Sequence, residues 1–134
     1  MMQKYLQIPY RFNGRTFDGC DCYGLIILRF KNELGIDLLD YKHGYSKPDQ
    51  FSDSNYLLEN TYNEFERVEP EKAEKHDVIL IRHESENADH IGMLTSKKMF
   101  MHSLTDHGVV QSRVSIWRRK IVGFYRHKGL INCL

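Results

Sequence analysis

The sequence predicts an α+β fold in which N-terminal helices pack on one side of a five- to six-stranded antiparallel sheet. From residue 22 to about residue 34, apolar residues recur at mostly helical spacing. After residue 77 the period changes, and short apolar runs of strand-forming residues follow one another. The spacings between consecutive runs are short, and short connections can join antiparallel strands as hairpins. Helices followed by a run of hairpins are typical of the α+β class.

The first helix is expected to begin at Cys22, directly after Asp21. An aspartate before a helix accepts backbone N–H groups that the first turn leaves unpaired. The apolar stripe runs through Leu34, and Gly35 is a suitable residue to end the helix. Before this helix, residues 1–19 are expected to form a short lead-in and a loop, with a turn at the Asn-Gly pair of residues 13–14.

A second helix is predicted from a cap at Asp53 and Ser54 to about Glu66. A connection rich in turn residues precedes it at 36–52, and a charged loop with Pro70 follows at 68–75. We then expect strands at 77–81, 90–94, 99–102, 108–112 and 121–126, arranged as a meander.

The composition is that of an ordinary globular chain, and we expect residues 1–134 to form a single domain. The formal net charge of +1 gives no electrostatic reason to expect nucleic acid as a partner. No apolar run approaches the ~20 residues of a membrane span. Three cysteines, two of them too close in sequence for an unstrained disulfide, indicate a reduced protein. The N-terminus has no apolar segment of the kind that secretory signals contain, so we expect no export signal.

Cys22 is the first candidate for chemistry. At the first position of a helix, the dipole and the unpaired N–H groups favour an anion, so we expect a lowered thiol pKa and a nucleophilic thiolate. The alternative is a buried structural cysteine that happens to begin a helix.

Two of the seven histidines differ from the rest because each lies in a predicted strand. His90 opens one strand and His102 closes the next, so in a hairpin their imidazoles could lie side by side at one edge of the sheet. An imidazole held there could take the thiol proton while the second group orients it. The alternative is two partly exposed histidines at strand ends. The other five are expected at the surface: His43, His76, His83, His107 and His127.

A zinc site is a further alternative, because Cys20, Cys22, His90 and His102 supply four possible ligands. Zinc-binding cysteines are usually two to four residues apart, and the Cys-x-Cys spacing here is tight. We therefore expect no metal and no other cofactor.

Three motifs resemble those of the NlpC/P60 family of cysteine peptidases. They are Asp-Cys-Tyr-Gly-Leu at residues 21–25, His-Ile-Gly-Met at 90–93 and Met-His-Ser at 101–103. The two histidines are twelve residues apart, as in the family, and Pro-Tyr at residues 9–10 matches a further family motif. Two departures, His76 before the strand and Tyr23 after the cysteine, remove no catalytic group.

The resemblance implies a papain-like fold with Cys22, His90 and His102 as the catalytic triad. It implies that Tyr10 supports the oxyanion site, and we expect Asp21 and Tyr23 beside the substrate. The implied substrate is the peptidoglycan stem peptide, cut at the bond between D-glutamate and the diamino acid.

Several segments resemble more narrowly the branch of the family found in tailed bacteriophages, among them residues 13–15, 19–22, 33–36 and 121–126. This implies a tail-associated peptidase with other tail-tip proteins as partners, located in the virion tail and acting in the bacterial cell wall. The expected lack of an export signal agrees with assembly of a virion in the host cytoplasm. The alternative is a structural tail-tip assembly protein with a covered active site, docking through residues 117–120 and 130–134.

Overall fold

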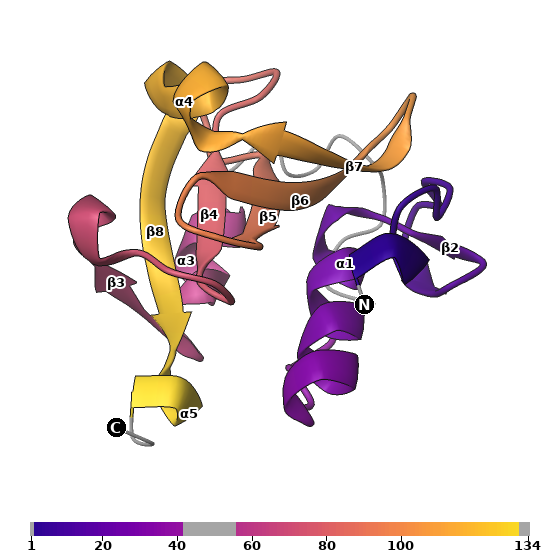
Figure 1. Cartoon of the computed structure of the whole chain (residues 1–134), viewed down its shortest axis with the longest axis horizontal. Coiled ribbons are helices and arrows are strands. Elements are labelled where there is room, and N and C mark those ends of the chain that lie inside the picture. Colours follow the sequence, from indigo (N-terminus) through magenta and orange to yellow (C-terminus); the bar gives the residue numbers. More distant parts are fainter. Residues whose placement is uncertain (1, 42–55, 132–134) are drawn as a thin grey trace.

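A computed structural model describes residues 2–41 and 56–131. A six-stranded sheet forms its centre, with the strand order β3-β8-β4-β5-β6-β7, and every neighbouring pair is antiparallel. Figure 1 shows this sheet with helix α1 beside it. The strands are β3 (Phe65–Val68), β4 (Val78–Ile81), β5 (His90–Leu94), β6 (Met99–Leu104), β7 (Gly108–Arg113) and β8 (Ile121–His127). The predicted fold class is confirmed.

Two expectations about this sheet are wrong. The last strand does not extend the meander, because β8 lies between β3 and β4 rather than beside β7. The second helix, α3 (Tyr56–Thr61), ends five residues earlier than predicted. Phe65, which falls inside the predicted helix, instead begins β3, because the antiparallel ladder with β8 takes up residues 65–68. The cap expected at Asp53 and Ser54 lies outside the described residues.

The first helix begins where predicted. Helix α1 (Cys22–Arg29) continues as a π-helical turn over Phe30–Leu34, and Gly35 closes it with a φ of 66°. A left-handed residue at this position is a common helix end. A two-stranded hairpin that the sequence did not predict, β1 (Arg15–Thr16) with β2 (Gly19–Cys20), precedes α1.

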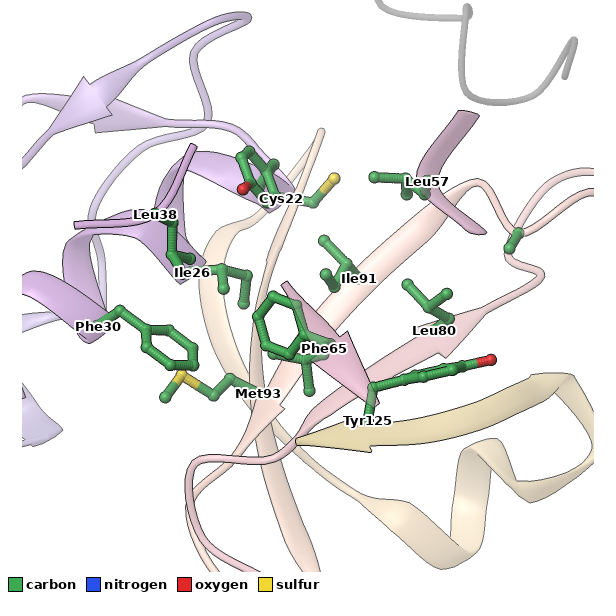
Figure 2. Packing of buried hydrophobic residues seen from close by; sticks show 13 residues of the cluster. Cys22, Ile26, Phe30, Leu38, Leu57, Phe65, Leu80, Ile91, Met93 and Tyr125 are labelled. Carbon is green, nitrogen blue, oxygen red and sulfur yellow. The ribbon is translucent and has the colours of Figure 1, made fainter. Parts of the chain in front are cut away.

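Apolar side chains cover both faces of the sheet. On one face, residues of α1 and α3 share a cluster with alternate residues of the central strands, including Ile91 and Met93 (Figure 2). On the other face, Leu94 and Phe100 pack with residues of α4 (Val114–Trp117). Successive side chains of a strand point to opposite faces, so His90 and His102 share the α4 face with Leu94 and Phe100.

Four short helical segments complete the described chain: 3₁₀ turns at Met2–Lys4, Pro70–Lys72 and Arg118–Lys120, and α5 (Lys128–Ile131) after β8. Arg29 fastens α1 to the sheet. Its buried guanidinium donates to the Met93 carbonyl at 3.0 Å and to Glu33 at 2.8 Å. Among the described helices, none combines the length and hydrophobicity that crossing a bilayer requires.

Candidate active site

Asp21 organises the loop that presents Cys22. Its carboxylate is buried and accepts from the backbone N–H groups of Gly24 at 2.7 Å and Asn13 at 3.0 Å, and from the Arg15 guanidinium at 2.9 Å. A Cβ atom on Gly24 would lie 2.0 Å from the Gly14 carbonyl oxygen, so only glycine allows this loop to pass so close to the helix. The Asp-Cys-Tyr-Gly motif therefore fixes the start of α1 against its own loop.

The Cys22 thiol lies at a gap in the sheet. The β5–β6 ladder is paired only at Met93 and Leu94, so the first half of β5 has no partner strand on the β6 side. The Leu94 N–H donates to the Asp77 carbonyl, which lies on the β4 side of β5. Successive N–H groups along a strand point to alternate sides. The Ile91 N–H, three residues earlier, therefore points away from β4 and into the gap. That N–H group hydrogen-bonds the Cys22 sulfur and lowers its pKa. The thiol of Cys22 thus bonds the edge of β5 that β6 leaves unpaired.

His90 and His102 lie side by side, as the hairpin argument expected. His90 Nε2 is 2.8 Å from His102 Nδ1, and both rings are buried. His102 Nε2 is in turn 2.8 Å from the hydroxyl oxygen of Ser112 on β7. The three side chains form a continuous hydrogen-bonded row across β5, β6 and β7.

The thiol and the imidazoles are not joined by a hydrogen bond among the described residues. The hydrogen-bond contacts of Cys22 are with the backbone N–H groups of Ile91 and Tyr23. His90 directly precedes Ile91 in the chain, so the imidazole and the thiol flank the same peptide unit.

The expected lowering of the Cys22 pKa is wrong for this structure. Burial raises the pKa of the thiol, and the nearby carboxylate of Asp21 raises it further, which outweighs the two backbone hydrogen bonds. Burial also lowers the pKa of His90 well below its usual value, with His102 and His83 contributing. The pKa of His102 falls to about 4, again chiefly through burial. At neutral pH the site therefore holds a neutral thiol and two neutral imidazoles.

Of the three residues expected beside the substrate, Tyr10 has a hydroxyl that lies near the thiol. It is half-buried, and its hydroxyl lies close enough to Cys22 and Asp21 that their charges add to the effect of burial in raising its pKa. Both carboxylate oxygens of Asp21 accept hydrogen bonds from the loop and the helix start. The hydroxyl of Tyr23, a buried side chain, donates to the Leu39 carbonyl at 2.6 Å. The contacts of these two residues are structural.

Sequence reasoning missed three neighbours of the histidine pair. Ser112 occupies an ordinary strand sequence with no motif around it. The ring of Trp117 stands at 90° to that of His102, with 5.1 Å between centroids. His83, expected at the surface, is half-buried with its ring centroid 5.4 Å from that of His90. For His83, the only available signal in the sequence was its position just after the predicted strand 77–81 and shortly before His90.

The other predicted residues lie away from this row. Cys20 is buried in a separate apolar cluster, and burial raises its pKa to about 12. Within the described ranges, no group of three or more histidine, cysteine, aspartate or glutamate side chains could hold a metal ion, so the ligand set of the zinc alternative is not assembled there. Of the other histidines expected at the surface, His107 is exposed, but His76 and His127 are half-buried: His76 pairs with Glu33 at 2.9 Å, and His127 packs against Phe30 and Phe65. His43 lies outside the described residues.

The fold and the site together define the class of protein: an α+β domain with a cysteine at a helix start and a histidine pair on the sheet beside it. The sequence model of the NlpC/P60 family matches residues 7–126, and the chain belongs to this family.

One curated relative is Tail tip assembly protein K of Escherichia phage N15, 28% identical over 118 residues. The match covers 82% of this chain and 46% of the relative, so this chain spans about half the relative's length. Similar solved structures include an NLP/P60-family protein of Staphylococcus aureus, described as similar to lipoprotein, with a TM-score of 0.64 and 20% identity, covering 94% of this chain and 39% of that one. Another is the NlpC/p60 domain of the peptidoglycan hydrolase SagA, with a TM-score of 0.58, 18% identity and coverage of 92% and 89%. At these identities the structural likeness shows the fold.

Proposed function

We propose that this protein is a cysteine endopeptidase that hydrolyses peptidoglycan stem peptides. The observation that carries the proposal is the 2.8 Å contact between His90 and His102 at the sheet gap where the Cys22 thiol lies. Membership of the NlpC/P60 family supports it, and so does the fold shared with the NlpC/p60 domain of the peptidoglycan hydrolase SagA.

In the proposed mechanism, the Cys22 sulfur attacks the carbonyl carbon of the scissile peptide bond while its proton passes to His90 Nδ1. His90 then gives that proton to the leaving amine as the C–N bond breaks, which leaves a thioester on Cys22. Water attacks the thioester with His90 as base, which releases the new carboxylic acid and restores the thiol. Because the resting thiol is protonated, the proton is transferred during attack rather than beforehand.

His102 would keep His90 in the required tautomer by accepting its Nε2–H. For the oxyanion, the proposed donors are the Cys22 backbone N–H, which a first helical turn leaves unpaired, and the Tyr10 hydroxyl. Each such donor is typically worth about 3 kcal/mol of transition-state stabilisation.

The proposed bond is that between D-glutamate and the diamino acid, as the family resemblance implies. We place the protein in a phage tail, among other tail-tip proteins and acting in the cell wall to help the tail cross it. The curated relative named as a tail tip assembly protein supports this placement.

The test is digestion of purified peptidoglycan by the wild type, Cys22→Ala and Cys20→Ala, with fragments identified by mass spectrometry. Cys20 is a matched control because it is also a buried thiol but lies in another cluster. We expect wild type and Cys20→Ala to release split stem peptides and Cys22→Ala to release none. Turnover by a folded Cys22→Ala protein would refute the assignment.

A second candidate function is structural assembly of the tail tip with a covered active site. The specific observation is burial: Cys22 is 6% exposed and His90 is 5% exposed. Leu57 of α3 belongs to the same packed cluster as Cys22, and its side chain extends toward the sulfur (Figure 2). If folded wild type releases no fragment, this function or gating by a partner is favoured.

A further inference from the structure

The charge of this chain is strongly divided along its length. Residues 94–134 contain eight lysines and arginines and one acidic residue, whereas residues 1–93 contain eleven basic and seventeen acidic residues. The net charge of +1 is therefore a balance between an acidic first part and a basic last part. In the fold, much of this basic charge gathers around α4, the 3₁₀ turn after it and the β5–β6 connection.

This basic surface is hollowed. An open hollow of about 650 Å³ is lined by Lys97, Lys98, Arg113 and Arg118, with the apolar side chains of Met99 and Val114. A second hollow, of about 550 Å³, lies along residues 115–120. We call the two together the basic hollow. It belongs to the α4 side of the sheet, whereas Cys22 reaches the gap from α1.

The cations of the basic hollow are unneutralised in the described parts of the chain. No salt bridge there involves Lys97, Lys98, Arg113 or the two arginines at 118 and 119. Three arginines elsewhere do have carboxylate partners: Arg15 pairs with Asp21, Arg29 with Glu33 and Arg126 with Asp77. Like charges held this close repel one another, so a ligand that brings negative charge would be attracted.

An apolar component accompanies the charge. Ile116 is 75% exposed at the rim of the hollow, and Lys120 lies over the Trp117 ring at 5.9 Å. A phosphate polymer offers no apolar group for Ile116, Met99 or Val114, whereas a peptide with acidic and aliphatic side chains can satisfy both parts of the surface.

We propose that the basic hollow docks an acidic segment of a partner protein that also presents an aliphatic side chain. This names a partner for the assembly role and does not depend on peptidase activity. The surface also adjoins the histidine row, because Arg113 follows Ser112 and Trp117 contacts His102.

The experiment measures binding of a fluorescent peptide of about twelve residues, rich in glutamate with two leucines, by anisotropy. The test variant is Lys98→Glu/Arg113→Glu/Arg118→Glu. The matched control is Lys31→Glu/Lys72→Glu/Lys75→Glu, which changes the net charge equally at exposed positions that do not line the hollow. Circular dichroism checks that both variants fold.

We expect the test variant to weaken binding about tenfold or more and the control to change it about twofold or less. Replacing the two leucines of the peptide by serine should also weaken binding. Equal losses in the two variants would show attraction by net charge alone and overturn the proposal. Preferential binding of a poly(glycerol phosphate) or of a DNA oligonucleotide, tested in the same assay, would overturn it in favour of a phosphate ligand.

Discussion

The proposed chemistry decides which atom donates in each hydrogen bond of the row formed by His90, His102 and Ser112. If His90 Nδ1 is to accept the thiol proton, the proton on His90 must reside on Nε2, where it is donated to His102 Nδ1. The proton of His102 then resides on Nε2 and is donated to Ser112. The serine hydroxyl would thus select the tautomer of a ring that touches no substrate.

Replacing Ser112 by alanine should lower kcat about tenfold with little change in KM, because one hydrogen bond of about 1–1.5 kcal/mol is lost from the supporting row. Ser112→Thr should restore most of the activity. A ¹⁵N NMR measurement of the His102 tautomer gives a readout that needs no turnover. Ser115→Ala, at an exposed serine, is the control, and an unchanged tautomer in Ser112→Ala would contradict the assignment.

The buried neutral state of His102 makes stability depend on pH. Its pKa is about 4 when folded and near 6.5 when unfolded, so the unfolded chain binds more protons at intermediate pH. The stabilisation is therefore complete above pH 6.5 and is lost as pH falls toward 4. Between pH 7 and about 4.5, His102 alone should cost about 2.5 kcal/mol of unfolding free energy.

Urea unfolding at these two pH values measures this loss. His102→Gln should lose about 2.5 kcal/mol less than the wild type over the same interval. His107→Gln, at an exposed histidine, should behave as the wild type does. Equal pH dependence in the wild type and His102→Gln would show that His102 is not kept neutral by the fold.

Among the elements, α3 and the split between β5 and β6 decide how Cys22 is presented. The split exposes the Ile91 N–H to the thiol, and Gly92 keeps β5 close to β6 beyond it. A Cβ atom on Gly92 would come within 2.7 Å of the Phe100 ring and 3.1 Å of the Met101 carbonyl oxygen. The His-x-Gly motif thus has a packing reason beside any catalytic one.

Leu57→Ala should make Cys22 more reactive, because the two residues share one buried cluster and removing the leucine side chain should admit solvent and reagent. We expect iodoacetamide to label the Cys22 peptide several times faster, with mass spectrometry used to distinguish it from the other cysteines. Leu58→Ala, at a half-buried neighbour in the same helix, is the control. Identical labelling rates in both variants and the wild type would show that α3 does not restrict access.

For the molecule as a whole, the sheet places two different surfaces back to back. The α1 face supplies the cysteine and most of the large apolar cluster, and the α4 face carries the histidine row and the basic hollow. Strand β8 ties the two ends of the sheet together. It follows β7, which is at one edge, but inserts between β3 and β4 near the other edge.

That residues 1–134 form one domain remains a prediction, and this topology supports it. Far-UV circular dichroism reports α1 among the helices, whereas the single tryptophan, Trp117, reports the opposite face. Urea transitions followed by the two signals should coincide, as they do when one cooperative unit unfolds. Two separate midpoints would show that the faces unfold independently.

What the sequence by itself determined was local. The N-cap at Asp21, the first helix beginning at Cys22, the glycine that ends it and the five short strands from residue 77 onward all follow from spacing and capping, and the structure has each of them. The pairing of His90 with His102 also followed, because a hairpin brings the start of one strand opposite the end of the next.

Only the tertiary structure decided the rest, because it depends on contacts between residues far apart in the chain. The position of β8, the strand made by Phe65 and its neighbours, and the contact of Ser112 with His102 are all set by strand partners that no local pattern specifies. The protonation of Cys22 is a further case. The helix start favours a thiolate, but burial in the folded protein favours the neutral thiol, and burial has the larger effect.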